Sequence, residues 1–423
     1  MIDRTVFAQR QDKVFAQLPE NSIAIVLGAK EQTRNRDVHY PFRQHSDLLY
    51  LLGFSEPDAA LVFIKNTTGS VLWFFCREKD PLKEQWDGRR LGPEAAVDAL
   101  GVDEAFSFNL FSEKVEALSA SADQVFLTDD LHEPLLADCE DKIKPLGALV
   151  HALRQIKDEG ELALMQGVAE LSVNAHRAAM QACKVGLHEY SLEAALEHSV
   201  RWQGAQAMAY PSIVASGDNA TILHYVENDQ SLEDGDLVLI DAGGELNGYA
   251  ADITRTFPVN GKFSQPQKEI YELVLKAQLA GIEEAKPGSS MVVIQEVINK
   301  VLVEGLVELK ILTGDVEQLL SEKAQVPYTV HGCGHWLGLD VHDVGAYFLD
   351  EKKSNPIPFQ HGMVITVEPG LYFKPDDTTV PEQYRGIGIR IEDDVYITES
   401  GHHVLTEGLE KTVDAIEQLM QRI

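Results

Sequence analysis

The order of apolar and polar positions divides the chain into two regions of different character. Residues 1–155 alternate short apolar runs with turns, as in SIAIVLGA, ALVFIKNTTGSVLWFF and QVFLTDD. Strand-like runs separated by helical stretches such as GPEAAVDALG indicate a mixed α/β arrangement. The pattern therefore predicts a smaller N-terminal α/β domain over residues 1–155 and a second domain over residues 156–423.

The second region opens on a helical period. In ALVHALRQIKDEGELALMQGVAELSVNAHRAAMQACKVG the apolar residues recur every three or four positions over roughly six turns, ending at Gly186. Further amphipathic helices are predicted over residues 190–202, 265–285 and 289–309. For the helix over 265–285, Ser264 is the expected N-cap, because serine accepts a hydrogen bond from the first helical turn.

Strand-like segments lie between and after these helices. They are DLVLIDAGG, AADITRTFPV, MVITVEPGLYF and GIGIRIEDDVYIT. Helices that alternate with such strands favour an α+β domain, in which the helices pack on one face of an antiparallel sheet.

Composition narrows the class of protein. The 423 residues are 44% hydrophobic and carry a formal net charge of −31, which disfavours nucleic acid as a partner because phosphate binding needs clustered Lys and Arg. The dispersed acid is typical of a solvated or salt-adapted surface. No apolar run approaches the roughly 20 residues that span a bilayer, so no membrane partner is expected. The four cysteines lack CxxC pairing, as in reduced cytoplasmic proteins.

The segment DLVLIDAGGELNGYAADITRTF predicts a hairpin that brings two aspartates together. If residues 245–248 form the loop, Asp241 lies opposite Asp252, with Cβ atoms about 5 Å apart. Two carboxylates this close repel each other unless a proton or a cation lies between them. The alternative is that one aspartate is a turn or surface acid, but the apolar residues before Asp241 make its exposure difficult.

Two further acids follow apolar strands. Glu368 closes MVITVE, and Glu392 ends GIGIRIE, where Arg390 shares its face by the two-residue strand period. Each alone is typical of a strand-end acid. Together with the two aspartates and one histidine they form a set of five candidate ligands that suits Mn(II), and also Co(II) or Zn(II). Four acids can hold two adjacent metal ions, which favours metal-assisted hydrolysis by a shared hydroxide.

The segment TVHGCGHWLGLDVHD contains three histidines, so the sequence leaves open which of them binds metal. His331 and His335 are four residues apart, as in helical zinc-protease motifs. The intervening Gly332 and Gly334 disfavour a helix, and the glutamate of such motifs is missing. A helical zinc-protease site is therefore excluded.

Four motifs together resemble a known family. In this order, IDAGGELNGYAADITRTF, HGCGHWLGLDVHD, TVEPGLY and GIGIRIEDD resemble the pita-bread-fold metallopeptidases, which include methionine aminopeptidase, prolidase and aminopeptidase P. VPEQYRGIGIRIEDD, HWLGLDVHDVG and the N-terminal YPFRQHSDLLYLLGFSEPDAAL are most similar to the bacterial aminopeptidase P branch. The resemblance covers the chain from about residue 35 to its end. It implies a pita-bread catalytic domain over 156–423, preceded by the N-terminal domain of that branch.

The resemblance also implies a metal shell. Its ligands are Asp241, Asp252, His335, Glu368 and Glu392. Asp252 and Glu392 would bridge two divalent ions, usually Mn(II) in this family. Glu368 would also carry a proton from the nucleophile to the departing proline nitrogen, which is reasonable chemistry for a carboxylate beside a nucleophile.

Other residues of the resemblance concern the substrate. His224 lies in a segment similar to the substrate-facing strand, and His342 resembles the histidine that binds near the scissile carbonyl, where charge develops. His331 resembles a residue on the proline side of the pocket, and Arg390 resembles a pocket arginine. Ordinary hydrogen-bonded histidines and a simple arginine salt bridge are the alternatives.

Three residues are expected to contact substrate less directly. Tyr372 resembles a pocket residue, although a core tyrosine would satisfy the same pattern. Trp86 and Asp37 match positions that reach a neighbouring subunit's active site in tetrameric relatives, so a homo-oligomer, either a dimer or a tetramer, is expected. Gly334 departs from the serine common in bacterial relatives and matches prolidases instead, and Cys333 is expected to be a buried thiol that points away from the metal.

The implied activity is release of the N-terminal residue from peptides with proline in second position. Prolidase, which cleaves Xaa-Pro dipeptides, is the nearest alternative, and methionine aminopeptidase is disfavoured because it usually lacks a large N-terminal domain. A different class is a catalytically inactive acidic binding module of the same fold. The presence of all five candidate ligands disfavours that class.

Overall fold

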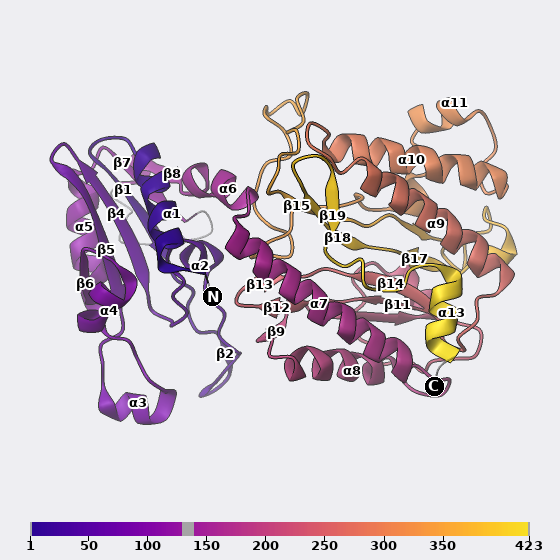
Figure 1. Cartoon of the computed structure of the whole chain (residues 1–423), viewed down its shortest axis with the longest axis horizontal. Helices are drawn as coiled ribbons and strands as arrows, with labels where there is room; N and C mark the ends of the chain where they lie inside the picture. The colour runs from indigo at the N-terminus through magenta and orange to yellow at the C-terminus, as the bar shows by residue number, and fades with distance from the viewer. Residues whose placement is uncertain (1, 129–138, 422–423) are drawn as a thin grey trace. The chain divides into compact units, whose positions relative to one another are not determined.

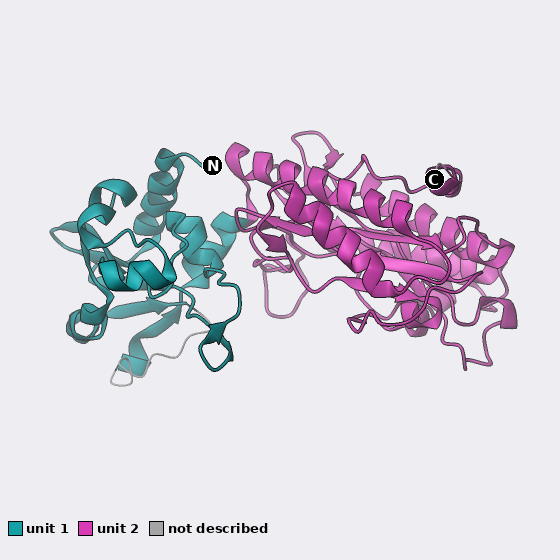
Figure 2. Cartoon of the chain, turned by 90° about the horizontal axis from the view of Figure 1, so that it is seen from below, with its two compact units in different colours: residues 1–154 teal, residues 155–423 magenta. Residues whose placement is uncertain are grey.

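The computed structural model describes residues 2–128 and 139–421. The chain forms two compact units, Met1–Arg154 and Gln155–Ile423, which are drawn in different colours in Figure 2.

The first unit is built on a six-stranded sheet of mixed direction. The strand order is β6-β5-β4-β1-β7-β8, with antiparallel β1–β4 and β4–β5 pairs and parallel β1–β7, β5–β6 and β7–β8 pairs. The strands are β1 (Ser22–Leu27), β4 (Ala60–Asn66), β5 (Gly69–Cys76), β6 (Glu104–Ser107), β7 (Gln124–Leu127) and β8 (Ile143–Pro145). Every residue of β1 is buried, as expected for an unbroken apolar run in a central strand. The predicted mixed α/β arrangement is confirmed.

Helices surround this sheet, and one of them stands apart. The helices are α1 (Arg4–Gln17), α2 (Ser46–Leu52), α3 (Pro81–Asp87), α4 (Pro93–Leu100), α5 (Phe111–Ser121) and α6 (Gly147–Gln155), and a small hairpin joins β2 (Thr33–Asn35) to β3 (Val38–His39). None of the residues of α3 is buried. Figure 1 shows α3 at the end of an excursion that projects from the sheet.

The long periodic segment forms two helices rather than one. The first is α6, and the second is α7 (Glu159–Ala182). The break has a local cause, since Asp158 caps α7 by accepting from the Glu161 N–H at 2.9 Å. In return the Glu161 carboxylate accepts from the Asp158 N–H at 3.0 Å, which completes a capping box.

The three other predicted helices are present as α8 (Glu189–Trp202), α9 (Gln265–Glu283) and α10 (Met291–Glu308). Ser264 is the N-cap of α9, and its N–H donates to the Gln267 side chain at 2.9 Å. The unit also contains the shorter α-helices α11 (Val316–Ser321), α12 (Val326–Thr329) and α13 (Val413–Gln421).

The sheets of the second unit are small, and every strand pairing in them is antiparallel. The strands are β9 (Ala207–Met208), β10 (Ile213–Ser216), β11 (Leu237–Asp241), β12 (Gly244–Leu246), β13 (Tyr249–Ala250), β14 (Thr254–Pro258), β15 (Val364–Val367), β16 (Gly370–Tyr372), β17 (Gly388–Arg390), β18 (Asp393–Ile397) and β19 (His402–Val404). α7 contacts β12 and β13, α8 contacts β9 and β10, and α9 contacts β15, β16 and β17. One apolar core joins these helices and strands, which confirms the predicted α+β class.

The aspartate hairpin has a different register from the predicted one. Its loop is the two-residue turn Asn247-Gly248, with φ of 52° and 86°, instead of four residues. The partner of Asp241 is consequently Thr254, so the prediction that Asp252 lies directly opposite is wrong. Because the shift is two residues, the side-chain parity of the strand is unchanged and both aspartates still reach one site.

All four cysteines are free and buried, including Cys333 in the main core, as predicted for that thiol.

Within residues 2–128 and 139–421, every helix is too short or too polar to cross a bilayer.

Candidate metal and substrate site

A cavity of about 350 Å³ in the second unit gathers most of the predicted site. Its walls contain the five predicted metal ligands and four of the predicted substrate residues. The lining residues are Leu223, His224, Asp241, Asp252, His331, Gly332, Gly334, His335, His342, Tyr347, Glu368, Arg390 and Glu392. Leu223 and Tyr347 also line the cavity, and the sequence carries no motif for either.

The four acids all stand where a strand ends. Asp241 is the last residue of β11, and Asp252 lies between β13 and β14. Glu368 follows β15 directly, and Glu392 lies between β17 and β18, where its N–H donates to the Thr254 carbonyl at 3.1 Å. Apolar strands thus carry the acids into the unit, and the strand ends release the side chains toward the cavity.

His335 lies in an irregular segment that runs beside β15. Its N–H donates to Thr366 Oγ1 at 3.1 Å, and the Thr366 N–H donates back to the His335 carbonyl at 2.9 Å. The Glu368 N–H donates to the Cys333 carbonyl at 2.9 Å. An ideal Cβ on Gly334 would lie 2.1 Å from the Thr366 carbonyl oxygen, so the missing side chain permits this close approach. The pairing places His335 beside Glu368.

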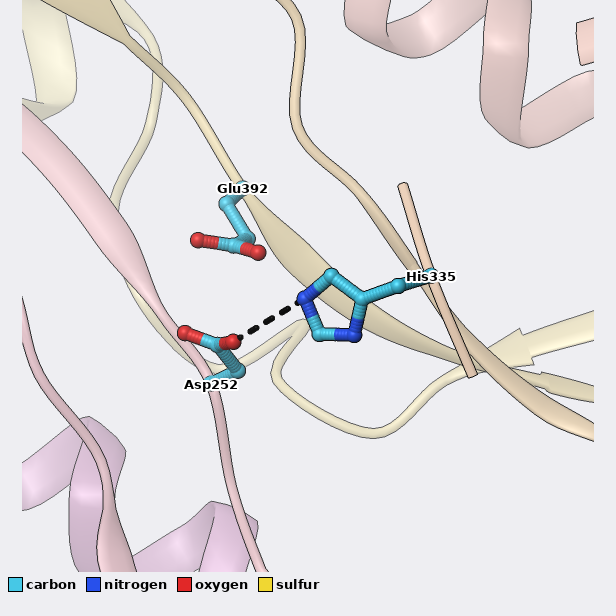
Figure 3. Close-up of side chains that lie close together, drawn as sticks. All are labelled: Asp252, His335 and Glu392. Carbon is cyan, nitrogen blue, oxygen red and sulfur yellow. Dashed lines mark ion pairs between the residues drawn. The ribbon is translucent and has the colours of Figure 1, made fainter. Parts of the chain in front are cut away.

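Three side chains converge closely enough to share one ion. Asp252, His335 and Glu392 each offer a ligand atom within 4.8 Å of the others (Figure 3). His335 Nε2 lies 3.3 Å from Asp252 Oδ2 and 3.7 Å from Glu368 Oε1. The other ring nitrogen, Nδ1, lies 2.9 Å from the Trp336 carbonyl, to which it donates. This contact leaves Nε2 as the ligand atom, an arrangement common for metal-binding histidines, and the residues fit a divalent ion.

Without a cation, the buried groups of this cluster have pKa values far from their ordinary ones. Burial raises the pKa of Glu368 to about 8, and Asp252 and Asp241 add to the rise. Burial also raises the pKa of Glu392 well above its usual value, again with help from Asp252. Burial alone would lower the pKa of His335, but its contacts with Asp252 and Glu368 raise it to about 9. The buried acids and the imidazole therefore hold protons in the metal-free protein. A divalent ion can take the place of these protons.

Tyr210 joins the two aspartates, and no motif in the sequence marks it. Its hydroxyl lies 2.7 Å from Asp241 Oδ1 and 2.5 Å from Asp252 Oδ1. Burial raises the pKa of Asp241, while in Asp252 the opposing effect of His335 overcomes burial and lowers the pKa. The pKa of Tyr210 is raised well above its usual value, first by burial and then by the two aspartates, so the phenol keeps its proton.

Arg390 connects the acids to the histidine side of the cavity. It donates from Nη2 to Asp241 Oδ2 at 2.5 Å, from Nη1 to the Tyr372 hydroxyl at 2.8 Å, and from Nε to Thr254 Oγ1 at 3.1 Å. The Tyr372 hydroxyl also lies 2.7 Å from His331 Nε2. Tyr372 therefore contacts two cavity residues from behind instead of lining the cavity itself.

The three other predicted histidines surround the acids. His331 Nδ1 lies 3.5 Å from Glu368 Oε2, and burial lowers the pKa of His331 to about 4. The rings of His342 and His335 meet edge to face at 4.4 Å, and burial lowers the pKa of His342 as well. His224 lines the same cavity from the segment that follows β10. Burial thus favours the uncharged rings of His331 and His342.

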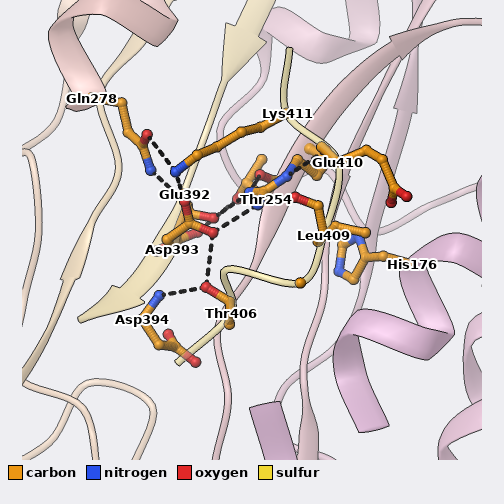
Figure 4. A network of polar contacts seen from close by, with 12 residues as sticks. His176, Thr254, Gln278, Glu392, Asp393, Asp394, Thr406, Leu409, Glu410 and Lys411 are labelled. Atoms are coloured by element: carbon orange, nitrogen blue, oxygen red, sulfur yellow. Dashed lines mark hydrogen bonds and ion pairs between the residues drawn. The ribbon is translucent and has the colours of Figure 1, made fainter. Parts of the chain in front are cut away.

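A buried polar network lies behind Glu392 (Figure 4). Asp393 accepts from Arg255 Nη2 and Lys411 Nζ, each at 2.7 Å. Burial would raise the pKa of Asp393, but Arg255 and Lys411 outweigh it and lower the pKa to about 2. Arg255 Nη1 also donates to the Glu392 carbonyl at 2.6 Å. The network therefore fixes the backbone that carries Glu392.

Two predicted residues lie elsewhere. Trp86 belongs to α3 and is 88% exposed, and Asp37 lies between β2 and β3. Both belong to the first unit, and neither lines the cavity.

Comparison with known families agrees with the two-unit organisation. Residues 163–399 match the model of metallopeptidase family M24, and residues 7–126 match the aminopeptidase P N-terminal domain.

Individual relatives are similar over nearly their full length. The Xaa-Pro aminopeptidase of Haemophilus influenzae is 45% identical, over 98% of this chain and 96% of its own. The Xaa-Pro aminopeptidase of Escherichia coli is 43% identical, over 99% and 98%. Among solved structures, Pseudomonas aeruginosa aminopeptidase PepP is 43% identical with a TM-score of 0.94, covering 99% of this chain and 98% of its own. The chain therefore belongs to metallopeptidase family M24, in the group of proteins that carry the aminopeptidase P N-terminal domain.

Proposed function

We infer that the chain is an Xaa-Pro aminopeptidase, a metal-dependent hydrolase that releases the N-terminal residue from peptides with proline in second position. The observation that carries this inference is full-length similarity, at 45% and 43% identity, to two proteins named Xaa-Pro aminopeptidase. Solved Escherichia coli aminopeptidase P structures, one in complex with substrate and one with the inhibitor Pro-Leu, are 42% identical with TM-scores of 0.94. These relatives favour the aminopeptidase over the prolidase alternative.

Divalent metal ions are the cofactor. We propose two ions, most suitably Mn(II), held by Asp241, Asp252, His335, Glu368 and Glu392, with Asp252 and Glu392 shared between them. Co(II) and Zn(II) suit the same donors, and a zinc-substituted form of the Escherichia coli enzyme has been solved. When bound, such ions polarise the carbonyl and lower the pKa of water.

Glu368 is the proposed proton carrier. Its carboxylate lies 3.7 Å from His335 Nε2, at the wall of the cavity. A carboxylate beside the nucleophile can take a proton from water and return it to the leaving nitrogen. That nitrogen belongs to proline, which lacks an N–H and must receive a proton to depart.

Three histidines that line the cavity are the proposed substrate contacts. His342 and His224 donate hydrogen bonds to peptide carbonyl oxygens, and His342 lies near the scissile carbonyl, where negative charge develops. His331 faces the proline side, where a neutral ring tolerates an apolar partner. Arg390 and Tyr372 hold His331 and Asp241 in place through their hydrogen bonds.

A homo-oligomer, either a dimer or a tetramer, is proposed to complete the site. The supporting observation is Trp86, a large aromatic side chain that is 88% exposed on a helix without buried residues. Together with Asp37, it would reach the active site of a neighbouring subunit. A cytoplasmic location is proposed because the four free, buried cysteines suit a reducing compartment.

Loss of single acids tests this function. Asp252→Ala and Glu392→Ala should each abolish release of the N-terminal residue from an Xaa-Pro-Yaa-Zaa tetrapeptide, followed by mass spectrometry in the presence of Mn(II). Glu399→Ala, at an exposed acid outside the cavity, is the matched control and should cleave like the wild type. Retained activity in both site variants would contradict the proposed shared ligands.

A further inference from the structure

The hydroxyl of Tyr210 contacts both Asp241 and Asp252. Its hydroxyl oxygen lies within hydrogen-bond distance of Oδ1 of Asp241 and Oδ1 of Asp252, at 2.7 and 2.5 Å. The two acids come from different arms of the β11–β14 hairpin, so Tyr210 is a side-chain connection between the arms.

The backbone on both sides of Tyr210 is paired with the same hairpin. On one side, the Ala209 N–H donates to the Gly243 carbonyl at 2.8 Å. On the other side, β10 pairs with β11, and Ile213 stands opposite Asp241. Strand pairing before and after Tyr210 therefore determines where its side chain can reach, and it reaches the aspartates.

In each aspartate, one carboxylate oxygen contacts Tyr210 and the other contacts a different residue. Asp252 offers Oδ2 to His335 Nε2 at 3.3 Å, while its Oδ1 faces the phenol. Asp241 offers Oδ2 to Arg390 Nη2, while its Oδ1 also faces the phenol. One hydroxyl proton shared by two Oδ1 atoms fixes how both carboxylates are turned, and a fixed turn is what a metal ligand needs.

We propose that Tyr210 is a positioning residue of the metal site, whose hydroxyl holds Asp241 and Asp252 in the orientation that binds the ions. This inference rests on the proposed metal-dependent function and deepens it. Tyr210 is absent from the residues that line the cavity, so it acts through the aspartates and not on the substrate.

A comparison of two tyrosines tests the role. Tyr210→Phe removes only the hydroxyl, and Tyr384→Phe is the matched control, because the Tyr384 hydroxyl donates to one carboxylate, that of Glu269 at 2.6 Å, away from the cavity. The affinity for Mn(II) is measured by competition with a chelating indicator, and the melting temperature is measured in EDTA. Tyr210→Phe should bind Mn(II) about 10–100-fold more weakly, the range for lost partners of metal ligands. Tyr384→Phe should bind like the wild type.

Kinetics separates positioning from catalysis. With Mn(II) raised to saturation, the kcat and KM of Tyr210→Phe should return to within a few-fold of the wild-type values. An unchanged Mn(II) affinity in a folded Tyr210→Phe protein, or a kcat that stays a hundred-fold low at saturating Mn(II), would overturn the proposed role. Failure of the wild-type protein itself to bind Mn(II) would instead overturn the metal-dependent function.

Discussion

Asp393→Asn is expected to destabilise the second unit strongly. The Asp393 carboxylate is fully buried, and each of its two oxygens accepts two hydrogen bonds. Arg255 Nη2 and Thr406 Oγ1 donate to Oδ1, at 2.7 and 2.8 Å, and Gln278 and Lys411 donate to Oδ2, each at 2.7 Å. An asparagine replaces one oxygen by an NH₂ group, so two donors then face a third donor and two cations lose their counter-charge.

The expected loss is about 3–5 kcal/mol, the range for breaking a buried ion pair from one side. The pKa of Asp393, about 2 in place of the ordinary 3.8, corresponds to about 2 kcal/mol for the charge alone. A unit of roughly 270 residues unfolds with an entropy of about 0.6 kcal/mol/K, so the melting temperature should fall by about 5–9 °C.

Thermal melts of the metal-free protein at pH 7 and at lower pH provide the measurement. Because the folded pKa is depressed, the stabilisation by Asp393 is complete above about pH 4 and is lost as the pH falls toward 2. The difference between wild type and Asp393→Asn should therefore narrow below pH 4. The control is Glu410→Gln, which removes a half-exposed ion pair with Arg177 and should shift the melt by less than about 2 °C. Equal shifts in the two variants would show that the buried Asp393 charge stabilises the unit no more than a surface ion pair does.

Three further predictions concern binding, packing and assembly. Mn(II) affinity should rise with pH up to about 9, because ions displace protons from His335 and Glu368, whose metal-free pKa values are about 9 and 8; a pH-independent affinity would contradict this. Gly243→Ala should lower the melting temperature, because its Cβ would lie 1.7 Å from the Ala251 carbonyl oxygen. Gly167→Ala, inside α7 with its nearest contact at 3.5 Å, should instead stabilise the fold by about 0.5–1 kcal/mol. Thermal melts of both variants check these opposite shifts. Trp86→Ala should shift the oligomer toward smaller species in light scattering, and an unchanged mass with unchanged activity would count against the proposed interface.

Local signals in the sequence predict those parts of the fold that depend on neighbours along the chain. Ser264 begins α9 as expected, because a cap is a local hydrogen bond. The apolar period does not predict the break between α6 and α7, because it continues across the capping box of Asp158 and Glu161. The predicted hairpin register is wrong because a four-residue loop over residues 245–248 also fits the sequence, whereas the chain turns at Asn247-Gly248.

In the site too, residues marked by local sequence are predictable, and residues placed by tertiary pairing are not. Acids at the ends of apolar strands were identifiable because charge at such positions is unusual, and the cavity contains all of them. Tyr210 was not identifiable, since its role depends on the pairing of β10 with β11 and not on a motif. Likewise the sequence places Tyr372 at the cavity surface, whereas tertiary packing places it behind Arg390.

Metal-dependent cleavage before proline in peptides longer than two residues can be measured with an Xaa-Pro dipeptide and an Xaa-Pro-Yaa-Zaa tetrapeptide. Both peptides are assayed first after chelation and then after addition of Mn(II). We expect the tetrapeptide to lose its N-terminal residue only when Mn(II) is present. Turnover of the dipeptide alone, or cleavage of the tetrapeptide that persists in the chelator, would contradict it.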